Sequence, residues 1–226
     1  MGRVYVVATP IGNLKDITYR AVEILHSVNL ILCEDTRHSR KLFQAYDIRA
    51  ELWSCPQQHQ RRVAEQLCER LGEDGEAAYV SDAGTPGISD PGSALVEVLY
   101  KAGHEVVPIP GPSALSAILS IDPFPGKTVI FEGFLSIKRG KRRSRINELL
   151  ASGDKFILYE SPYRIVAALA DMADAEPERQ LVLGREMTKI HEEYRFGTSA
   201  EIHNDFARRD SIKGEFALLV SGAKKR

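Results

Sequence analysis

The stretch VYVVATPIGNL, residues 4–14, joins a run of β-branched residues to a loop that contains proline and glycine. A short apolar run predicts a buried strand, and the loop that follows it lies at the strand's carboxyl end. Similar runs alternate with helical patterns through the first half of the chain, at residues 30–33, 52–53, 77–80 and 106–109. Because these runs are too apolar to be half exposed, we predict a mostly parallel sheet covered by helices.

Helix signals separate the predicted strands. Thr18 is expected to cap the first helix, and residues 37–46 are expected to form the second. Asp90 is expected to cap a later helix that has Pro91 at its first position and ends at Gly103.

The second half repeats the alternation. Strands are expected at residues 128–131, 156–159, 181–183 and 216–220, with helices around 145–150 and 165–172 between them. The stretch IDPFPG, residues 121–126, is the best candidate for a linker. We therefore predict an α/β protein of two domains, residues 1–118 and 119–226.

Composition narrows the class of protein. The chain has 226 residues and is 43% hydrophobic, and 30 Lys and Arg against 31 Asp and Glu give a net charge of −1. This balance excludes a protein that coats nucleic acid with a wholly basic surface, but it allows a local basic patch. Three cysteines without a CxxC pair suit a reducing compartment, and no apolar run reaches the ~20 residues of a membrane span. We expect a cytoplasmic protein.

Three loops at predicted strand ends are candidates for ligand binding: residues 9–14, 81–92 and 110–114. None contains a dinucleotide or triphosphate signature. The alternative is that their glycine and proline residues only form turns. The longest carries Asp82 and Asp90 and no Lys or Arg, so it would repel a bare polyphosphate. A cationic ligand rich in hydroxyl and amine groups suits it, and S-adenosylmethionine is one such ligand.

Residues 33–38, CEDTRH, concentrate ionisable side chains after the second predicted strand. They form either an active site or a helix cap with an ion pair to Arg37, and both interpretations stay open. A metal site is not expected here, because Glu34, Asp35 and His38 lack a recognised ligand spacing. No metal site is predicted elsewhere.

Several motifs occur in a consistent order: ATPIGNL (8–14), CEDTR (33–37), SDAGTP (81–86), PIPGPSA (108–114), FEGFL (131–135), YESPYR (159–164) and GREMTK (184–189). Over nearly its whole length the chain resembles the ribosomal small-subunit RNA 2′-O-ribose methyltransferase I family, within the tetrapyrrole methylase superfamily. The resemblance implies a mostly parallel N-terminal sheet, a mixed C-terminal sheet and a homodimer. It also implies S-adenosylmethionine bound in a cleft between the domains. Many members carry a further helical segment, whereas this chain stops at Lys224, Lys225 and Arg226.

The resemblance implies methylation of a cytidine 2′-hydroxyl in 16S RNA, as RNA or as the assembled small subunit. Carried over by motif, the cofactor contacts are Pro10, Asp82, Gly84, Thr85, Ser113, Ala114, Leu158, Tyr159 and Ala217.

A ribose hydroxyl is a weak acid, so methyl transfer to it should need a positioned base or a charge-stabilising group. The candidates are Glu34, Asp35, Glu186 and Lys189. Lys189 could act as a base only if its pKa were lowered, and otherwise would stabilise the developing alkoxide. A surface salt bridge between Arg185 and Glu186 is the alternative for that pair.

RNA binding needs positive surface, and residues 138–145, KRGKRRSR, contain no acid. We expect Arg142, Arg143 and Arg145 to bind RNA there, and Arg37 and Arg185 to hold phosphate. A solvated helix start is the alternative for the cluster. We also expect the target nucleotide to be splayed out before reaction.

Two rival functions remain open: methylation of a tetrapyrrole or another metabolite with the same cofactor, and ligand binding without turnover. Incubation with labelled methyl donor and unmodified ribosomal subunits would distinguish them, because label would enter RNA, a small molecule or nothing.

Overall fold

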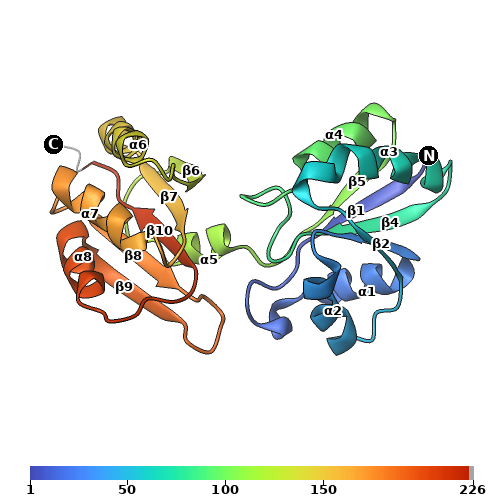
Figure 1. The fold of residues 1–226 in the computed structure, drawn as a ribbon, viewed down its shortest axis with the longest axis horizontal. Helices are drawn as coiled ribbons and strands as arrows, with labels where there is room; N and C mark the ends of the chain where they lie inside the picture. The colour runs from blue at the N-terminus through green and yellow to red at the C-terminus, as the bar shows by residue number, and fades with distance from the viewer. Residues whose placement is uncertain (224–226) are drawn as a thin grey trace. The chain divides into compact units, whose positions relative to one another are not determined.

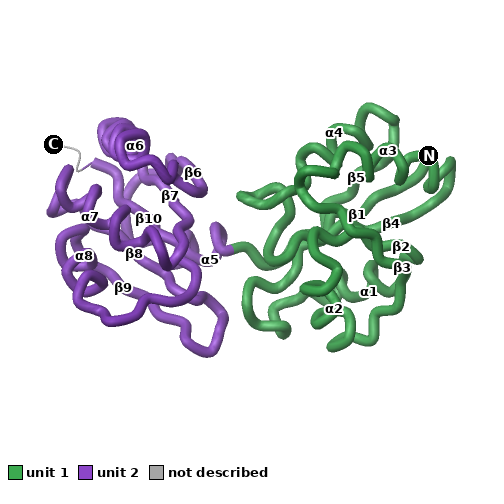
Figure 2. The backbone as a smooth tube through the Cα atoms, in the orientation of Figure 1, with its two compact units in different colours: residues 1–113 green, residues 114–226 purple. Residues whose placement is uncertain are grey.

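The computed structural model describes residues 1–223, so the basic residues Lys224, Lys225 and Arg226 lie outside the described part. The chain divides into two compact units, residues 1–113 and 114–226 (Figure 2). This division lies five residues before the expected boundary of 118, because helix α5 (Ala114–Ser120) packs against strands of the second unit.

The first unit is built around a parallel sheet. Its strands are β1 (Arg3–Val7), β2 (Leu30–Cys33), β3 (Glu51–Ser54), β4 (Glu76–Val80) and β5 (Glu105–Ile109). They pair in the order β3-β2-β4-β1-β5, and every pair is parallel. The predicted parallel sheet is confirmed.

Helices cover both faces of this sheet (Figure 1). They are α1 (Tyr19–Ser27), α2 (Thr36–Ala45), α3 (Gln60–Leu71) and α4 (Ser93–Lys101), with short 3-10 turns η1 (Leu14–Asp16) and η2 (Gln57–His59). Alternate strand residues point to opposite faces, so Val7 and Ile31 pack with α1 and α2, while Val4 and Leu32 pack with α3 and α4. Burial on both faces explains why the strand sequences are continuously apolar.

Helix α4 begins later than expected. The prediction that Asp90 caps it and Pro91 opens it is wrong, because Gly92 at φ +150° precedes the first helical residue, Ser93. Both predicted residues belong to the preceding loop instead. The Ser81 hydroxyl donates to Asp90 over 3.5 Å, and the Tyr79 hydroxyl donates to the carbonyl of Pro91 over 3.1 Å.

The second unit has a mixed sheet, as expected. Its strands are β6 (Val129–Phe134), β7 (Lys155–Glu160), β8 (Gln180–Arg185), β9 (Glu193–Thr198) and β10 (Phe216–Val220). In the order β6-β7-β10-β8-β9, only the β6–β7 pair is parallel. Three helices pack on one face: α6 (Arg139–Ser152), α7 (Ile165–Ala175) and α8 (Ser199–Ala207).

Helix α5 packs on the other face of this sheet, where a Cβ added at Gly184 would lie 3.1 Å from Ile118 of α5. The sheet therefore has one face under three helices and another that α5 covers only in part. Within residues 1–223, no helix is both long and apolar enough to cross a lipid bilayer.

Candidate functional site

Backbone and side-chain hydrogen bonds join three loops of the first unit at the carboxyl edge of its sheet. Thr9 and Gly84 exchange two backbone hydrogen bonds of 2.8 and 3.0 Å, which tie the loop after β1 to the loop after β4. The Thr85 hydroxyl donates to the carbonyl of Pro112 over 3.0 Å and so ties in the loop after β5. Since β4, β1 and β5 are neighbours in the sheet, the three predicted ligand loops form one edge.

Two glycines allow the close approach of these loops. Gly84 has φ +77°, and a Cβ there would lie 3.2 Å from Ile11 of the first loop. At Gly111 a Cβ would lie 3.0 Å from the Cβ of Ala8. The structure thus brings together Pro10, Asp82, Gly84, Thr85 and Ser113, the cofactor residues expected in this unit.

The loop after β2 joins the same edge. The backbone N–H of Asp35 donates to Oδ1 of Asp82 over 3.1 Å. This bond orients the Asp82 carboxylate and places Glu34 and Asp35 beside the loops that the sequence assigned to the cofactor.

Thr9 is a residue of this edge that sequence reasoning missed. Its side chain is buried, with the residue 2% exposed, and its hydroxyl has no hydrogen-bond partner among the described residues. A buried hydroxyl without a partner costs about 1–3 kcal/mol, so its position points to a polar ligand at this edge. The carboxylate of Asp82 matches a cationic ligand. Both features fit S-adenosylmethionine, and the sequence signal was the position of Thr9 directly after the first strand.

Glu34 and Asp35 differ in their electrostatic surroundings. Burial of Glu34, and then the negative charge of Asp82, raise the pKa of its carboxyl group. Asp35 caps α2: the backbone N–H of Arg37 donates to it over 2.8 Å, and the Arg37 side chain pairs with it over 3.4 Å. The hydrogen bonds from Arg37 lower the pKa of Asp35. The Glu34 carboxylate therefore binds a proton more tightly than the Asp35 carboxylate does.

In the second unit, Tyr159 and Ala217 lie side by side on neighbouring strands. Ala217 pairs in register with Tyr159 on one side and with Gly184 on the other. This row lies on the face opposite the three helices. The side chain of Leu158 points into the helix-covered core, so any contact from Leu158 to a ligand on the other face would use its backbone.

The GREMTK motif forms a tight turn after β8. Glu186 and Thr188 have positive φ angles of 48° and 67°, a conformation rare for residues with side chains. Lys189 Nζ lies 2.8 Å from carboxylate oxygens of both Glu186 and Glu215. Burial lowers the pKa of Lys189, but the hydrogen bonds to these two carboxylates outweigh it and the net pKa is raised. Lys189 is held as a cation, which favours charge stabilisation over base catalysis.

Arg185 and Glu186 each pair with another residue, and not with each other as the alternative interpretation of the sequence had it. Arg185 pairs with Glu193 over 3.2 Å and donates to the carbonyl of Lys213 over 2.7 Å. Burial raises the pKa of Glu186, but Lys189 and the N–H of Glu215 outweigh it, so the net pKa of Glu186 is lowered.

The basic cluster of residues 138–145 is largely neutralised by acids of β6, α7 and α6 itself. Arg142 is buried, and its guanidinium pairs with the buried Asp171 of α7 over 2.7 Å. The expectation that Arg142 binds RNA is corrected, because its guanidinium lies in the protein interior. Arg143 pairs with Asp174 over 3.5 Å. Arg145 pairs with Glu132 and Glu148, and the Glu132 contacts are 2.7 and 2.9 Å.

Sequence comparison with known proteins identifies the family of this chain. A protein from Borrelia garinii named Ribosomal RNA small subunit methyltransferase I is 46% identical over 218 residues, which is 96% of this chain and 97% of that protein. A protein of the same name from Thermotoga maritima is 41% identical, over 98% of this chain and 99% of its own length. The family model described as Tetrapyrrole (Corrin/Porphyrin) Methylases matches residues 3–203. The chain belongs to this methyltransferase I family of tetrapyrrole methylases.

Solved structures of other tetrapyrrole methylases share the fold. The methyltransferase CobJ matches with a TM-score of 0.73 at 18% identity, covering 100% of this chain and 96% of that one. Uroporphyrin-III C-methyltransferase from Thermus thermophilus, complexed with S-adenyl homocysteine, matches with a TM-score of 0.63 at 16% identity, over 96% and 97% of the two chains.

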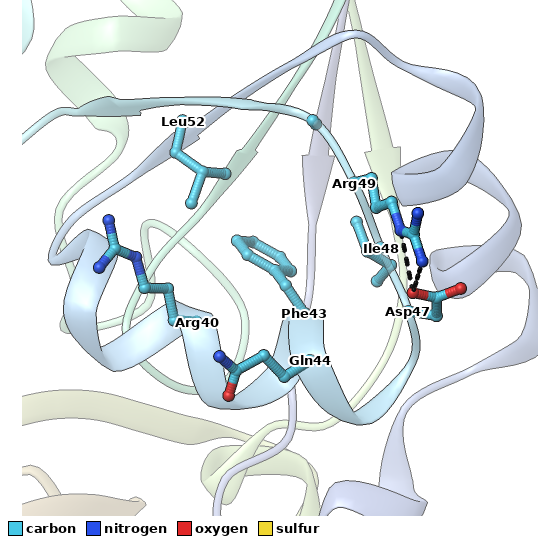
Figure 3. Close-up of a pocket in the computed structure, with 8 residues that line it drawn as sticks. Arg40, Phe43, Gln44, Asp47, Ile48, Arg49 and Leu52 are labelled. Atoms are coloured by element: carbon cyan, nitrogen blue, oxygen red, sulfur yellow. Dashed lines mark hydrogen bonds and ion pairs between the residues drawn. The ribbon is translucent and has the colours of Figure 1, made fainter.

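Within the first unit, a pocket of about 340 Å³ lies between α2 and the segment that leads into β3 (Figure 3). Phe43 and Leu52 form part of its wall, and the Arg49 side chain turns to Asp47, 3.0 Å away (Figure 3). The pocket contains none of the residues that the sequence assigned to the methylase cofactor. The cofactor assignment therefore stays with the loops of residues 9–14, 81–92 and 110–114.

Proposed function

We propose that the protein transfers a methyl group from S-adenosylmethionine to the 2′-hydroxyl of a cytidine in 16S ribosomal RNA. The observation that carries this proposal is the 46% identity, over 96% of this chain, to a protein named Ribosomal RNA small subunit methyltransferase I. The solved uroporphyrin-III C-methyltransferase and cobalt precorrin-4 methyltransferase are 17% and 16% identical to this chain, a likeness that supports the fold and not the substrate.

The linked loops of the first unit are our proposed cofactor site. Pro10, Asp82, Gly84, Thr85 and Ser113 lie at one sheet edge, together with the Thr9 hydroxyl, which has no hydrogen-bond partner within residues 1–223. The bound cofactor would supply a methyl group already activated by its sulfonium. Contacts from Ala114, Leu158, Tyr159 and Ala217 stay predictions.

Glu34 is our proposed acceptor of the ribose hydroxyl proton, because its pKa is raised while those of Asp35 and Glu186 are lowered. Lys189 is a proposed cation for the developing negative charge on the ribose oxygen.

Arg37 and Arg143, whose ion pairs with Asp35 and Asp174 are long at 3.4 and 3.5 Å, are proposed phosphate contacts. Arg145 and Arg185 would have to exchange a carboxylate partner to bind phosphate. Activity as a homodimer in the cytoplasm also stays a prediction.

The test incubates the protein with methyl-labelled S-adenosylmethionine and small ribosomal subunits that lack the modification. We expect label in 16S RNA at one cytidine, in a ribose that resists alkaline cleavage of its 3′ phosphodiester. Label on a base, or label only in an added tetrapyrrole, would contradict the proposal. Asp82→Asn should bind the cofactor more weakly, whereas Asp16→Asn, on an exposed 3-10 turn, serves as the matched control.

A further inference from the structure

Three apolar side chains are exposed where the parallel strands β6 and β7 end. Tyr163 is 95% exposed, Ile137 is 75% exposed and Phe134 is 53% exposed. Phe134 is the last residue of β6, and Tyr163 lies in the turn between β7 and α7. Large apolar groups in such positions usually mark a binding surface when they gather in one place.

A β-bulge orients Phe134. The register of β6 against β7 shifts between Phe131 and Gly133, and Gly133 has φ +71°. As a result Phe131 and Phe134, three residues apart, both pack edge-on against Tyr159, with ring centroids 5.1 and 5.9 Å away. Phe134 thereby continues the row of Tyr159, Ala217 and Gly184 across four strands. Bulges often re-aim a side chain next to a functional site.

Arg164 holds the two strand ends together. It pairs with the buried Glu160 over 2.9 Å and donates to the carbonyl of Leu135 over 3.2 Å. Its guanidinium also lies 5.8 Å from the centroid of the Phe134 ring. The turn that presents Tyr163 is therefore fixed against the end of β6 before any ligand arrives.

Unneutralised positive charge follows Phe134 and Ile137 in the chain. Lys138 and Lys141 are exposed, and within residues 1–223 neither forms an ion pair with a carboxylate. They are the part of the basic cluster that the acids of α7 and β6 leave free. Exposed aromatic rings together with free cations are the combination that binds single-stranded nucleic acid, through base stacking and phosphate contact.

We infer that Phe134 and Tyr163 form a stacking platform for an unpaired base of the RNA substrate, with Lys138 and Lys141 on the adjoining phosphates. The inference rests on the proposed function for the identity of the RNA. The platform would hold a nucleotide that has left its helix, because stacked and paired bases do not offer a free face.

The first test measures binding of a short single-stranded RNA at low salt. Tyr163→Ala should weaken binding roughly five- to hundredfold, the range for loss of one base–aromatic stack. Tyr163→Phe should bind like the wild type, because it keeps the ring. The control is Phe196→Ala, which removes an aromatic residue that is 58% exposed on edge strand β9 of the same unit. Equal binding by wild type and Tyr163→Ala, or equal weakening by Phe196→Ala, would overturn the inference.

The second test uses fluorescence. Trp53 is the single tryptophan, so Trp53→Phe gives a silent background for Tyr163→Trp or Phe196→Trp. RNA should quench the fluorescence of the first and leave the second unchanged, and an RNA with abasic sites should quench much less. Equal quenching at both positions, or by the abasic RNA, would contradict stacking.

Neither test requires turnover. If quenching at position 163 occurs while no ribosomal RNA becomes methylated, the proposed function fails and the platform stands. If methylation occurs without any effect of Tyr163→Ala on binding or KM, the platform fails and the function stands. A partner protein that binds to this face while RNA does not would also overturn the inference.

Discussion

Glu34 shows how a single carboxyl group couples stability to pH in this protein. Its pKa is raised by burial and by Asp82, so the native state holds this proton more tightly than the unfolded chain does. The free energy of unfolding therefore falls as pH rises from the ordinary Glu value through the raised pKa. Glu34→Gln should raise Tm at neutral pH, have little effect on Tm below pH about 4, and slow methyl transfer.

Thermal denaturation over a pH series, with single-turnover kinetics alongside, measures these effects. Glu23→Gln, an exposed change on α1, should alter neither quantity. A Tm difference for Glu34→Gln that is constant across pH would show that desolvation of the carboxylate is not its cause.

Arg142 is the clearest case in which a neighbour distant in sequence decides a residue's role. Among the residues that the structure describes, Arg142→Ala would leave the buried Asp171 with only the contacts of 3.8 and 3.9 Å from Arg139 and Arg143. We expect a loss of about 3 kcal/mol in the free energy of unfolding, measured in urea. Lys141→Ala, its exposed neighbour, should stay within about 0.5 kcal/mol of wild type. A similar small effect for both would show that the ion pair is dispensable.

At the scale of elements, the buried apolar strands could be predicted from the sequence, whereas the polar strand β9 could not. Strands at residues 30–33 and 216–220 have the predicted bounds because their residues are buried on both faces. Edge strand β9 and helix α8 were missed, since EYRFGT is mostly exposed and lacks the apolar run. The capping box of Thr198 and Glu201 was the available signal for α8.

The candidate site could also be predicted only in part. Sequence motifs predicted which loops meet, because parallel strands end at one edge, and the glycines in those loops permit close contact. The acids that neutralise residues 138–145 could not be predicted, because Asp171 and Glu132 come from α7 and β6 and only the fold brings them near.

The loop after β5 depends on a close approach to β1 at Gly111. In Gly111→Ala the added Cβ would lie 3.0 Å from Ala8 Cβ, so the loop must move. We expect a stability loss of about 1 kcal/mol and a roughly tenfold weaker affinity for S-adenosylmethionine, measured by calorimetry. Gly140→Ala, where a Cβ on exposed α6 meets nothing within 4 Å, should leave the affinity unchanged. Wild-type affinity in Gly111→Ala would separate this loop from the cofactor site.

For the whole molecule, a net charge of −1 means that RNA binding depends on where the cations lie and not on their number. Each phosphate contact to single-stranded RNA adds about 0.7 to the slope of log binding constant against log salt. Replacing Lys138 and Lys141 together by Ala should therefore lower that slope by about 1.4, measured by filter binding between about 50 and 200 mM salt. Arg145→Ala should change it much less, because Glu132 and Glu148 already neutralise this guanidinium. A larger change for Arg145→Ala than for the two lysines would mean that RNA displaces those carboxylates, and would place the phosphate track along α6 instead of at its start.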